Sequence, residues 1–189
     1  MRLIPEKYNK NNGGDMKGVI ATCLAGLVKE NFGRDKWEDA LEDAGLDRHA
    51  IFSATNKVDD ATVLKVVASV CKVLNISALQ AADAFGDYWV NVYAPRIYGA
   101  YLQEAKTAKE LLLGMDKIHE TVTSTIPNAH PPRFDYKWRD DYTLIMTYKS
   151  PRGLIDFLVG LIKGVGRYFN EDIKVQKRSQ TDVEIIFAR

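Results

Sequence analysis

Apolar residues recur three and four positions apart through the first two-thirds of the chain, which is the spacing of one face of an amphipathic helix. The first such run comprises Val19, Ile20, Cys23, Leu24, Leu27 and Val28. Asp15 is placed to cap the start of this helix, and Gly33 is placed to end it. Further helices are expected over residues 37–44, 60–74, 77–94 and 107–125. Ser77 is expected to cap the third of these, which stops before Pro95.

After residue 132 the apolar spacing changes from helical to alternating, as in strands with one buried face. Strands are expected at 133–138, 141–150, 173–178 and 183–189, paired as two hairpins. The first hairpin turns at Arg139-Asp140-Asp141, and an apolar helical run at 153–169 separates the two hairpins. This order predicts an α+β fold, with a helical N-terminal lobe followed by a C-terminal antiparallel sheet lobe that carries an inserted helix.

The composition is that of an ordinary globular domain, with 46% hydrophobic and 27% charged residues among 189. A formal net charge of +1, with scattered basic residues, does not provide the positive electrostatic field that attracts nucleic acid. No apolar run approaches the roughly 18 residues of a membrane span. The N-terminus also lacks the charged segment followed by an apolar segment that is typical of a secretory signal. Residues 1–15 are polar and end in turn-forming residues. We interpret them as an extension, flexible or introduced by cloning, before one domain at 16–189.

The two cysteines, Cys23 and Cys71, both lie within apolar helical runs. We expect them to be buried, reduced thiols, as in a cytoplasmic protein. Their spacing excludes a cysteine zinc site and a heme attached covalently through a CxxCH motif.

His119 lies on an apolar helical stripe with Leu112 and Met115, three and four residues apart. One interpretation is a packed, neutral histidine whose N–H meets a backbone carbonyl. The other is an axial ligand, because heme iron in an apolar slot commonly binds a neutral imidazole. The histidine alone does not decide between them, since the two propionates of a heme would also need partners.

The segment "MTYKSPRG" (146–153) supplies groups of the kind that propionates need. Tyr148, Ser150 and Arg152 alternate, so on a strand running into a turn they point to one side. A phenol, a hydroxyl and a guanidinium form a donor array suited to carboxylates or phosphate. Alone the triplet also fits a surface strand edge, but with an upstream histidine on an apolar helix it favours a heme site.

With these motifs the chain resembles the heme–nitric oxide/oxygen binding (H-NOX) family, the sensor domain shared with soluble guanylate cyclase. The resemblance covers essentially residues 16–189. It rests on the segments "MKG", "AFGDYWV", "MDKIH", "HPPRF", "YKSPR" and "VGLIKGVGRYF". Its most specific feature is the tyrosine–x–serine–x–arginine motif at the right distance after the histidine.

The resemblance implies a b-type heme between the two lobes, with His119 as the proximal iron ligand. Tyr148, Ser150 and Arg152 would bind the propionates. Pro132 would pack against the porphyrin and bend it, and Met115 is assigned to the same pocket. His130 matches no residue with a role in the family.

Phe157 occupies the position where O2-binding members of the family carry a distal tyrosine, and phenylalanine offers bound O2 no hydrogen bond. The other positions expected on the distal side are Ile20, Leu24, Trp89 and Leu161. The resemblance therefore implies a sensor that binds nitric oxide (NO) and CO and excludes O2. The alternative is an O2-binding member in which Tyr93 or the Trp89 indole N–H supplies the donor.

In the mechanism that the resemblance implies, NO weakens the bond between iron and His119, the heme relaxes against Pro132, and the lobes shift. A separate signalling protein would read the shift, and a histidine kinase or a cyclic-di-GMP enzyme is expected.

Two other classes of protein compete with this sensor. A heme enzyme would need distal acid–base groups, but the distal candidates include no histidine, arginine or carboxylate. A heme-free interaction module would leave the arrangement of His119, Tyr148, Ser150 and Arg152 unexplained.

Overall fold

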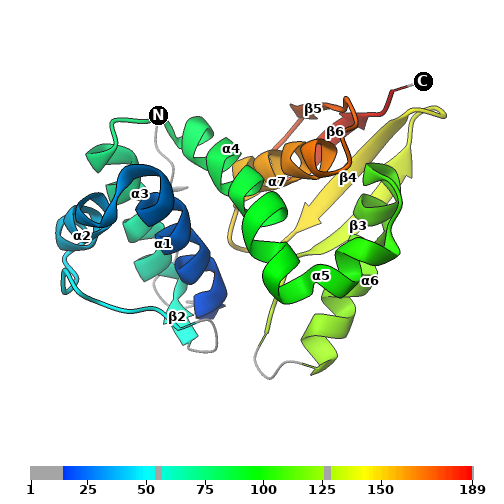
Figure 1. Cartoon of the computed structure of the whole chain (residues 1–189). Coiled ribbons are helices and arrows are strands. Elements are labelled where there is room, and N and C mark those ends of the chain that lie inside the picture. Colours follow the sequence, from blue (N-terminus) through cyan, green and yellow to red (C-terminus); the bar gives the residue numbers. More distant parts are fainter. Residues whose placement is uncertain (1–14, 54–56, 126–128, 189) are drawn as a thin grey trace. The chain divides into compact units, whose positions relative to one another are not determined.

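The computed structural model describes residues 15–53, 57–125 and 129–188, and the chain divides into two compact units, 1–81 and 82–189 (Figure 1). The first unit is mainly helical, and the second contains a four-stranded antiparallel sheet. This confirms the α+β class and the order of a helical region before a sheet region. The expected N-terminal extension lies outside the described residues, apart from Asp15.

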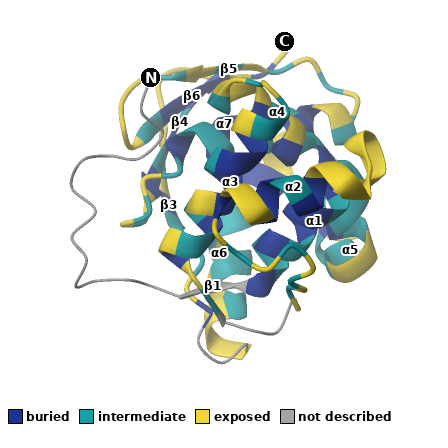
Figure 2. Ribbon diagram, turned by 90° about the vertical axis from the view of Figure 1, so that its left-hand side faces the viewer, coloured by how far each residue is buried: buried dark blue, intermediate teal, exposed yellow. Residues whose placement is uncertain are grey.

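The first unit contains β1 (Asp15–Lys17), α1 (Gly18–Phe32), α2 (Arg34–Asp43), β2 (Lys57–Asp59) and α3 (Asp60–Val73). The three helices bury apolar stripes against one another (Figure 2). β1 and β2 form a short antiparallel pair in which Asp15 lies opposite Asp59. The prediction that Asp15 caps α1 is therefore wrong, because Asp15 belongs to a strand. Asp59 instead caps α3, where its carboxylate accepts the Thr62 N–H at 3.0 Å.

Gly33 ends α1, as predicted. Its φ of +91° is one that other residues rarely adopt, and its N–H donates to the Lys29 carbonyl at 3.2 Å. Cys23 on α1 and Cys71 on α3 are buried free thiols, which confirms the expectation for both. Burial raises the pKa of both thiols and so keeps them protonated.

The helix that was predicted to stop before Pro95 continues past it. α4 (Ala78–Tyr88) passes into a π-helical turn, η1 (Trp89–Tyr93), and then into α5 (Ala94–Glu104). Ser77 caps α4 as predicted, since its hydroxyl accepts the Gln80 N–H at 3.2 Å. Pro95 lacks an N–H and its ring crowds the preceding turn of a regular helix. The π turn directly before α5 accommodates this proline, so the chain stays helical.

The second unit also contains α6 (Ala108–Thr125), β3 (Arg133–Trp138), β4 (Thr143–Lys149), α7 (Ile155–Tyr168), β5 (Lys174–Lys177) and β6 (Asp182–Ile186). The strands are all antiparallel, in the order β3-β4-β6-β5, so both predicted hairpins and the inserted helix are confirmed. Asp140 closes the first hairpin by accepting the backbone N–H groups of Tyr142 and Thr143. The inner face of the sheet packs against α6 and α7 through fully buried residues such as Leu144 and Ile185.

Glycines allow α4 and α7 to cross with their backbones in contact. A Cβ atom on Gly86 would lie 2.1 Å from the Gly160 carbonyl carbon, and one on Gly164 would lie 2.5 Å from the Gly86 carbonyl oxygen. An ion pair between Lys163 and Asp83, at 3.0 Å, flanks the crossing. Because any side chain at these glycines would separate the helices, they fix how closely α4 approaches α7.

Among the described residues, no single helix is long and apolar enough to span a membrane. α3 and residues 78–104 pass the same length and composition test only when taken together.

Candidate functional site

His119 lies near the middle of α6, and a backbone carbonyl fixes its tautomer. Its Nδ1 lies 2.6 Å from the carbonyl oxygen of Pro132. A carbonyl can only accept, so Nδ1 carries the proton and Nε2 keeps a free lone pair. Burial lowers the pKa of the imidazole, although the Pro132 carbonyl and Asp116 partly oppose this. The side chain is therefore a neutral imidazole in the form that binds metals.

Asp116, one turn before His119, holds the start of β3 against α6. Its carboxylate accepts two hydrogen bonds from Arg133, at 2.7 and 2.6 Å, and one from the Phe134 N–H at 2.8 Å. The Arg133 guanidinium holds the pKa of Asp116 at about 2, so the pair is ionised. These contacts fix the two residues after Pro132 and so position the carbonyl that orients His119. We call His119, Pro132, Asp116, Arg133 and Phe134 the histidine cluster.

The predicted donor triplet lies at the end of β4, and one of its members reaches the histidine cluster through aromatic packing. Tyr148 is buried opposite Phe134, with their ring centroids 6.2 Å apart, and the Phe134 ring lies 5.4 Å from the His119 ring. β4 ends at Lys149, so Ser150 and Arg152 lie in the following turn rather than on the strand.

Two hydrogen bonds order that turn. The Ser150 hydroxyl accepts the Arg152 N–H at 3.3 Å. The Arg152 guanidinium donates to the carbonyl of His130 at 2.7 Å. His130, which has no side-chain role by resemblance, therefore anchors Arg152 through its backbone.

A second group of expected site residues gathers around α4, η1 and α7. The ring centroid of Phe85 lies 5.8 Å from that of Trp89 and 5.3 Å from that of Phe157. Trp89 also packs against Tyr93 at 5.5 Å and Tyr98 at 6.4 Å. We call these five residues the aromatic group.

The remaining expected residues lie elsewhere. Leu161 on α7 and Met115 on α6 are partly buried against the core of the second unit. Ile20 and Leu24 lie on α1 in the first unit, half-buried and buried respectively.

Sequence reasoning missed five residues of these two sets, and one of them, Tyr98, lies beyond the quoted segments and had no signal. Asp116, Arg133 and Phe134 had a signal, because "MDKIH" and "HPPRF" place an acid one turn before the histidine and a base directly after the double proline. Phe85 lies within the quoted segment "AFGDYWV", but its contact with Phe157 depends on the glycine crossing of α4 and α7.

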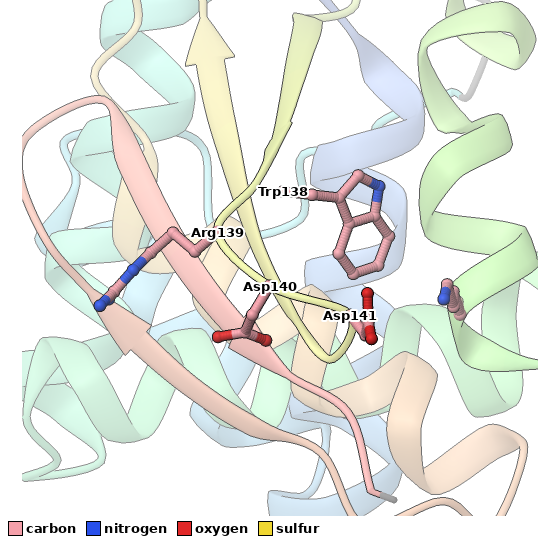
Figure 3. A pocket seen from close by; sticks show the side chains of 5 residues that line it. Trp138, Arg139, Asp140 and Asp141 are labelled. Carbon is pink, nitrogen blue, oxygen red and sulfur yellow. The ribbon is translucent and has the colours of Figure 1, made fainter.

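A separate surface hollow of about 510 Å³ is lined by Lys109, Trp138, Arg139, Asp140 and Asp141 (Figure 3). The Lys109 ammonium lies 4.4 Å from the centroid of the Trp138 ring, a cation–π contact. Arg139 is paired with the buried Glu184, and Asp140 closes the β3–β4 turn. The charged groups of this hollow thus mainly stabilise the hairpin, and none belongs to the histidine cluster.

The sequence matches the model of one protein family, described as Haem-NO-binding (HNOB), over residues 17–177. The chain belongs to the haem-NO-binding family. Membership confirms the resemblance to the H-NOX domains and makes this a domain of a heme-binding, gas-sensing class related to the heme domain of soluble guanylate cyclase.

Two relatives in this family come from Caenorhabditis elegans. Soluble guanylate cyclase gcy-32 is 28% identical over 178 residues, covering 90% of this chain and 26% of that protein. Soluble guanylate cyclase gcy-34 is 27% identical over 178 residues, with the same two coverages. The chain thus spans about a quarter of the length of these haem-NO-binding relatives.

Solved H-NOX structures share the fold. An oxygen-binding H-NOX domain related to soluble guanylate cyclases, solved as its oxygen complex, matches with a TM-score of 0.77 and 23% identity over 92% of this chain and 96% of that one. An Fe(II) unliganded mutant H-NOX protein from K. algicida matches with a TM-score of 0.79 and 22% identity over 92% and 97%. At these identities the likeness establishes a common fold.

Proposed function

We propose that this domain is a heme-based gas sensor in which His119 is the proximal ligand of a b-type heme. The observation that carries the proposal is the His119 tautomer in a chain that belongs to the haem-NO-binding family. The bond from Nδ1 to the Pro132 carbonyl would also suit a packed histidine, but it leaves Nε2 unprotonated and able to bind iron. Metal-bound histidines usually donate their other ring N–H in this way. When bound, the heme supplies an iron coordination position for a diatomic gas. The residues around it hold the cofactor, orient His119 and select the gas.

Tyr148, Ser150 and Arg152 are proposed to hold the propionates. Two of them lie in an ordered turn directly after β4, and the third connects to His119 through Phe134. Arginine offers carboxylates a planar, bidentate fork, and hydroxyls add further donors. Pro132 and Met115 are proposed to contact the porphyrin near His119.

The domain is proposed to bind NO and CO and to exclude O2. Phe157 packs edge-to-face on Phe85 and offers no hydrogen to a bound ligand. The other residues proposed for the distal pocket are Ile20, Leu24, Trp89 and Leu161, which apart from the indole N–H are apolar. Bound O2 carries partial negative charge, so the absence of a hydrogen-bond donor weakens the binding of O2 more than the binding of NO. An O2-binding sensor is the second candidate, because the packing of Trp89 on Tyr93 brings two donors into the same aromatic group.

Signalling is proposed to pass through His119. His119 would hold the heme from α6, and a loss of that hold on gas binding would free α6 to move and so pass on the signal. A separate protein would read this movement, and a histidine kinase or a cyclic-di-GMP enzyme is the proposed partner. The buried free thiols of Cys23 and Cys71 suit a cytoplasmic site of action.

The first test replaces the proposed ligand. His119→Gly should lose the histidine-ligated heme spectrum, and added imidazole should restore it by occupying the vacated position. His130→Gly is the matched control, since His130 accepts the Arg152 hydrogen bond through its backbone carbonyl, which the substitution keeps. An unchanged ferrous spectrum in His119→Gly, without imidazole, would remove His119 as the ligand and with it the proposed function.

A further inference from the structure

The phenol hydroxyl of Tyr136 lies between two backbone groups of α6. It accepts the Asp116 N–H at 3.1 Å and donates to the Leu112 carbonyl at 2.9 Å. In a regular α-helix these two groups, four residues apart, are each other's hydrogen-bond partners. Tyr136 belongs to β3, opposite Met146 on β4, so a rigid strand delivers the hydroxyl to the helix. The bridged turn ends three residues before His119.

The two halves of α6 on either side of this turn are held differently. In the first half Ala108, Leu111 and Leu112 are buried, and Glu171 accepts the Ala108 N–H at 3.1 Å. After Asp116 the helix has no fully buried residue up to Thr125. This second half is held by polar bonds, from Asp116 to Arg133 and from His119 to Pro132, and its apolar packing comes from the partly buried Ile118 and the His119 ring. A buried half and a half held by hydrogen bonds thus meet at the Tyr136 bridge.

Widening a helical turn normally leaves one N–H and one carbonyl without partners, which is costly where water is excluded. The Tyr136 hydroxyl offers a partner to both groups. A side chain inserted into a helical hydrogen-bond ladder is also a known cause of local bending. The Leu112–Asp116 turn can therefore open at lower cost than an equally buried turn without such a side chain.

We propose that Tyr136 is a positioning residue that makes the Leu112–Asp116 turn a hinge for the half of α6 that carries His119. The inference rests on the proposed function in one respect, that His119 is the group through which gas binding acts. The buried half stays fixed in the core while the second half swings with the histidine. A plain structural clamp between β3 and α6 would have the opposite effect, since it would resist movement of His119.

The test compares Tyr136→Phe with the wild-type domain, with Tyr168→Phe as the matched control because Tyr168 lies on α7 and packs against Phe169. After rapid mixing of the ferrous heme-loaded domain with NO, the absorption spectrum reports NO association and then loss of the histidine ligand. For a hinge, Tyr136→Phe slows ligand loss roughly tenfold and leaves NO association unchanged, because opening now strands two backbone groups. Faster or unchanged ligand loss overturns the hinge.

A heme-free measurement keeps the hinge separate from the proposed function. NMR relaxation dispersion on the heme-free chain reports motion of α6 on the microsecond-to-millisecond scale. We expect exchange after Asp116 but not before Leu112 in the wild-type domain, and its suppression in Tyr136→Phe. If that variant does not fold, the wild-type domain alone decides the matter. Equal exchange in the residues before Leu112 and after Asp116 overturns the hinge. Failure to bind heme would remove the proposed function and leave this result standing.

Discussion

The histidine cluster and the aromatic group belong to the same unit but are built from different interactions. Around His119, Asp116 and Arg133 form charge-assisted hydrogen bonds, and a carbonyl fixes the imidazole tautomer. Around Trp89 the contacts are aromatic rings 5.3 to 6.4 Å apart, supported by helices that cross at glycines. Hydrogen bonds fix the direction in which a side chain points, whereas packed rings determine the shape and the polarity of the space beside them. We infer that the first region controls how a ligand residue is held and the second controls which gas can bind.

The largest expected effect comes from the helix crossing beneath the aromatic group. In Gly160→Ala the new methyl would lie 2.1 Å from the Ala82 carbonyl oxygen. We expect the free energy of unfolding to fall by about 3 kcal/mol, because two backbones must separate. Gly114→Ala is the control, since a methyl there meets nothing within 4 Å and should stabilise α6 by up to about 1 kcal/mol. Urea unfolding of both variants measures this, and equal effects of the two substitutions would contradict the close crossing.

A smaller expected effect tests the gas selectivity assigned to the aromatic group. Phe157→Tyr adds one hydroxyl at the position where a donor is missing, and we expect the ferrous heme-loaded variant to form an oxygen complex in air. Tyr93→Phe removes a hydroxyl from the same group and should leave the response to air unchanged. Absorption spectra before and after exposure to air provide the measurement. An oxygen complex in the wild-type domain that disappears in Tyr93→Phe would move the donor to Tyr93.

The smallest expected effect concerns the histidine cluster. Asp116→Asn should lower the free energy of unfolding by about 1 kcal/mol at pH 7, a modest amount because the Arg133 side chain is partly exposed. The pKa of Asp116 is about 2 in the folded domain, below its ordinary value of 3.8. Its stabilising contribution is therefore complete above pH 3.8 and is lost as the pH falls towards 2.

The difference in unfolding free energy between wild type and Asp116→Asn should accordingly shrink between pH 4 and pH 2. Asp135→Asn is the control, because Asp135 pairs with Lys149 at an exposed position and its removal should have little effect. A difference that does not depend on pH in this window would mean that the Asp116 carboxylate does not stabilise the cluster through its charge.

Most of the fold follows from local patterns in the sequence. β3 alternates cleanly, β4 does so apart from Ile145, and the two strands carry their own turn at Asp140, so their pairing was predictable. β1 and β2 have three residues each, too short to show a period, and their pairing joins positions 40 to 44 residues apart. Pro95 was misjudged because proline usually ends a helix, and a π turn has no recognisable sequence pattern.

The site was predictable in its chemistry but only partly in its connections. His119 and the Tyr148–Arg152 motif stand out by residue type and spacing. The bonds that orient them, from Asp116 to Arg133 and from Arg152 to His130, connect residues 17 and 22 positions apart. Such pairs depend on how α6 and β4 pack against the start of β3, which local patterns do not contain.

The absorption spectrum of the purified ferrous domain, recorded in air and then with NO, tests the proposed sensor most directly. We predict a histidine-ligated heme spectrum that air leaves unchanged and NO alters. A stable oxygen spectrum would retain the heme and contradict the exclusion of O2. Absence of a heme band after reconstitution would contradict the sensor itself and return His119 to the role of a packed histidine bonded to Pro132.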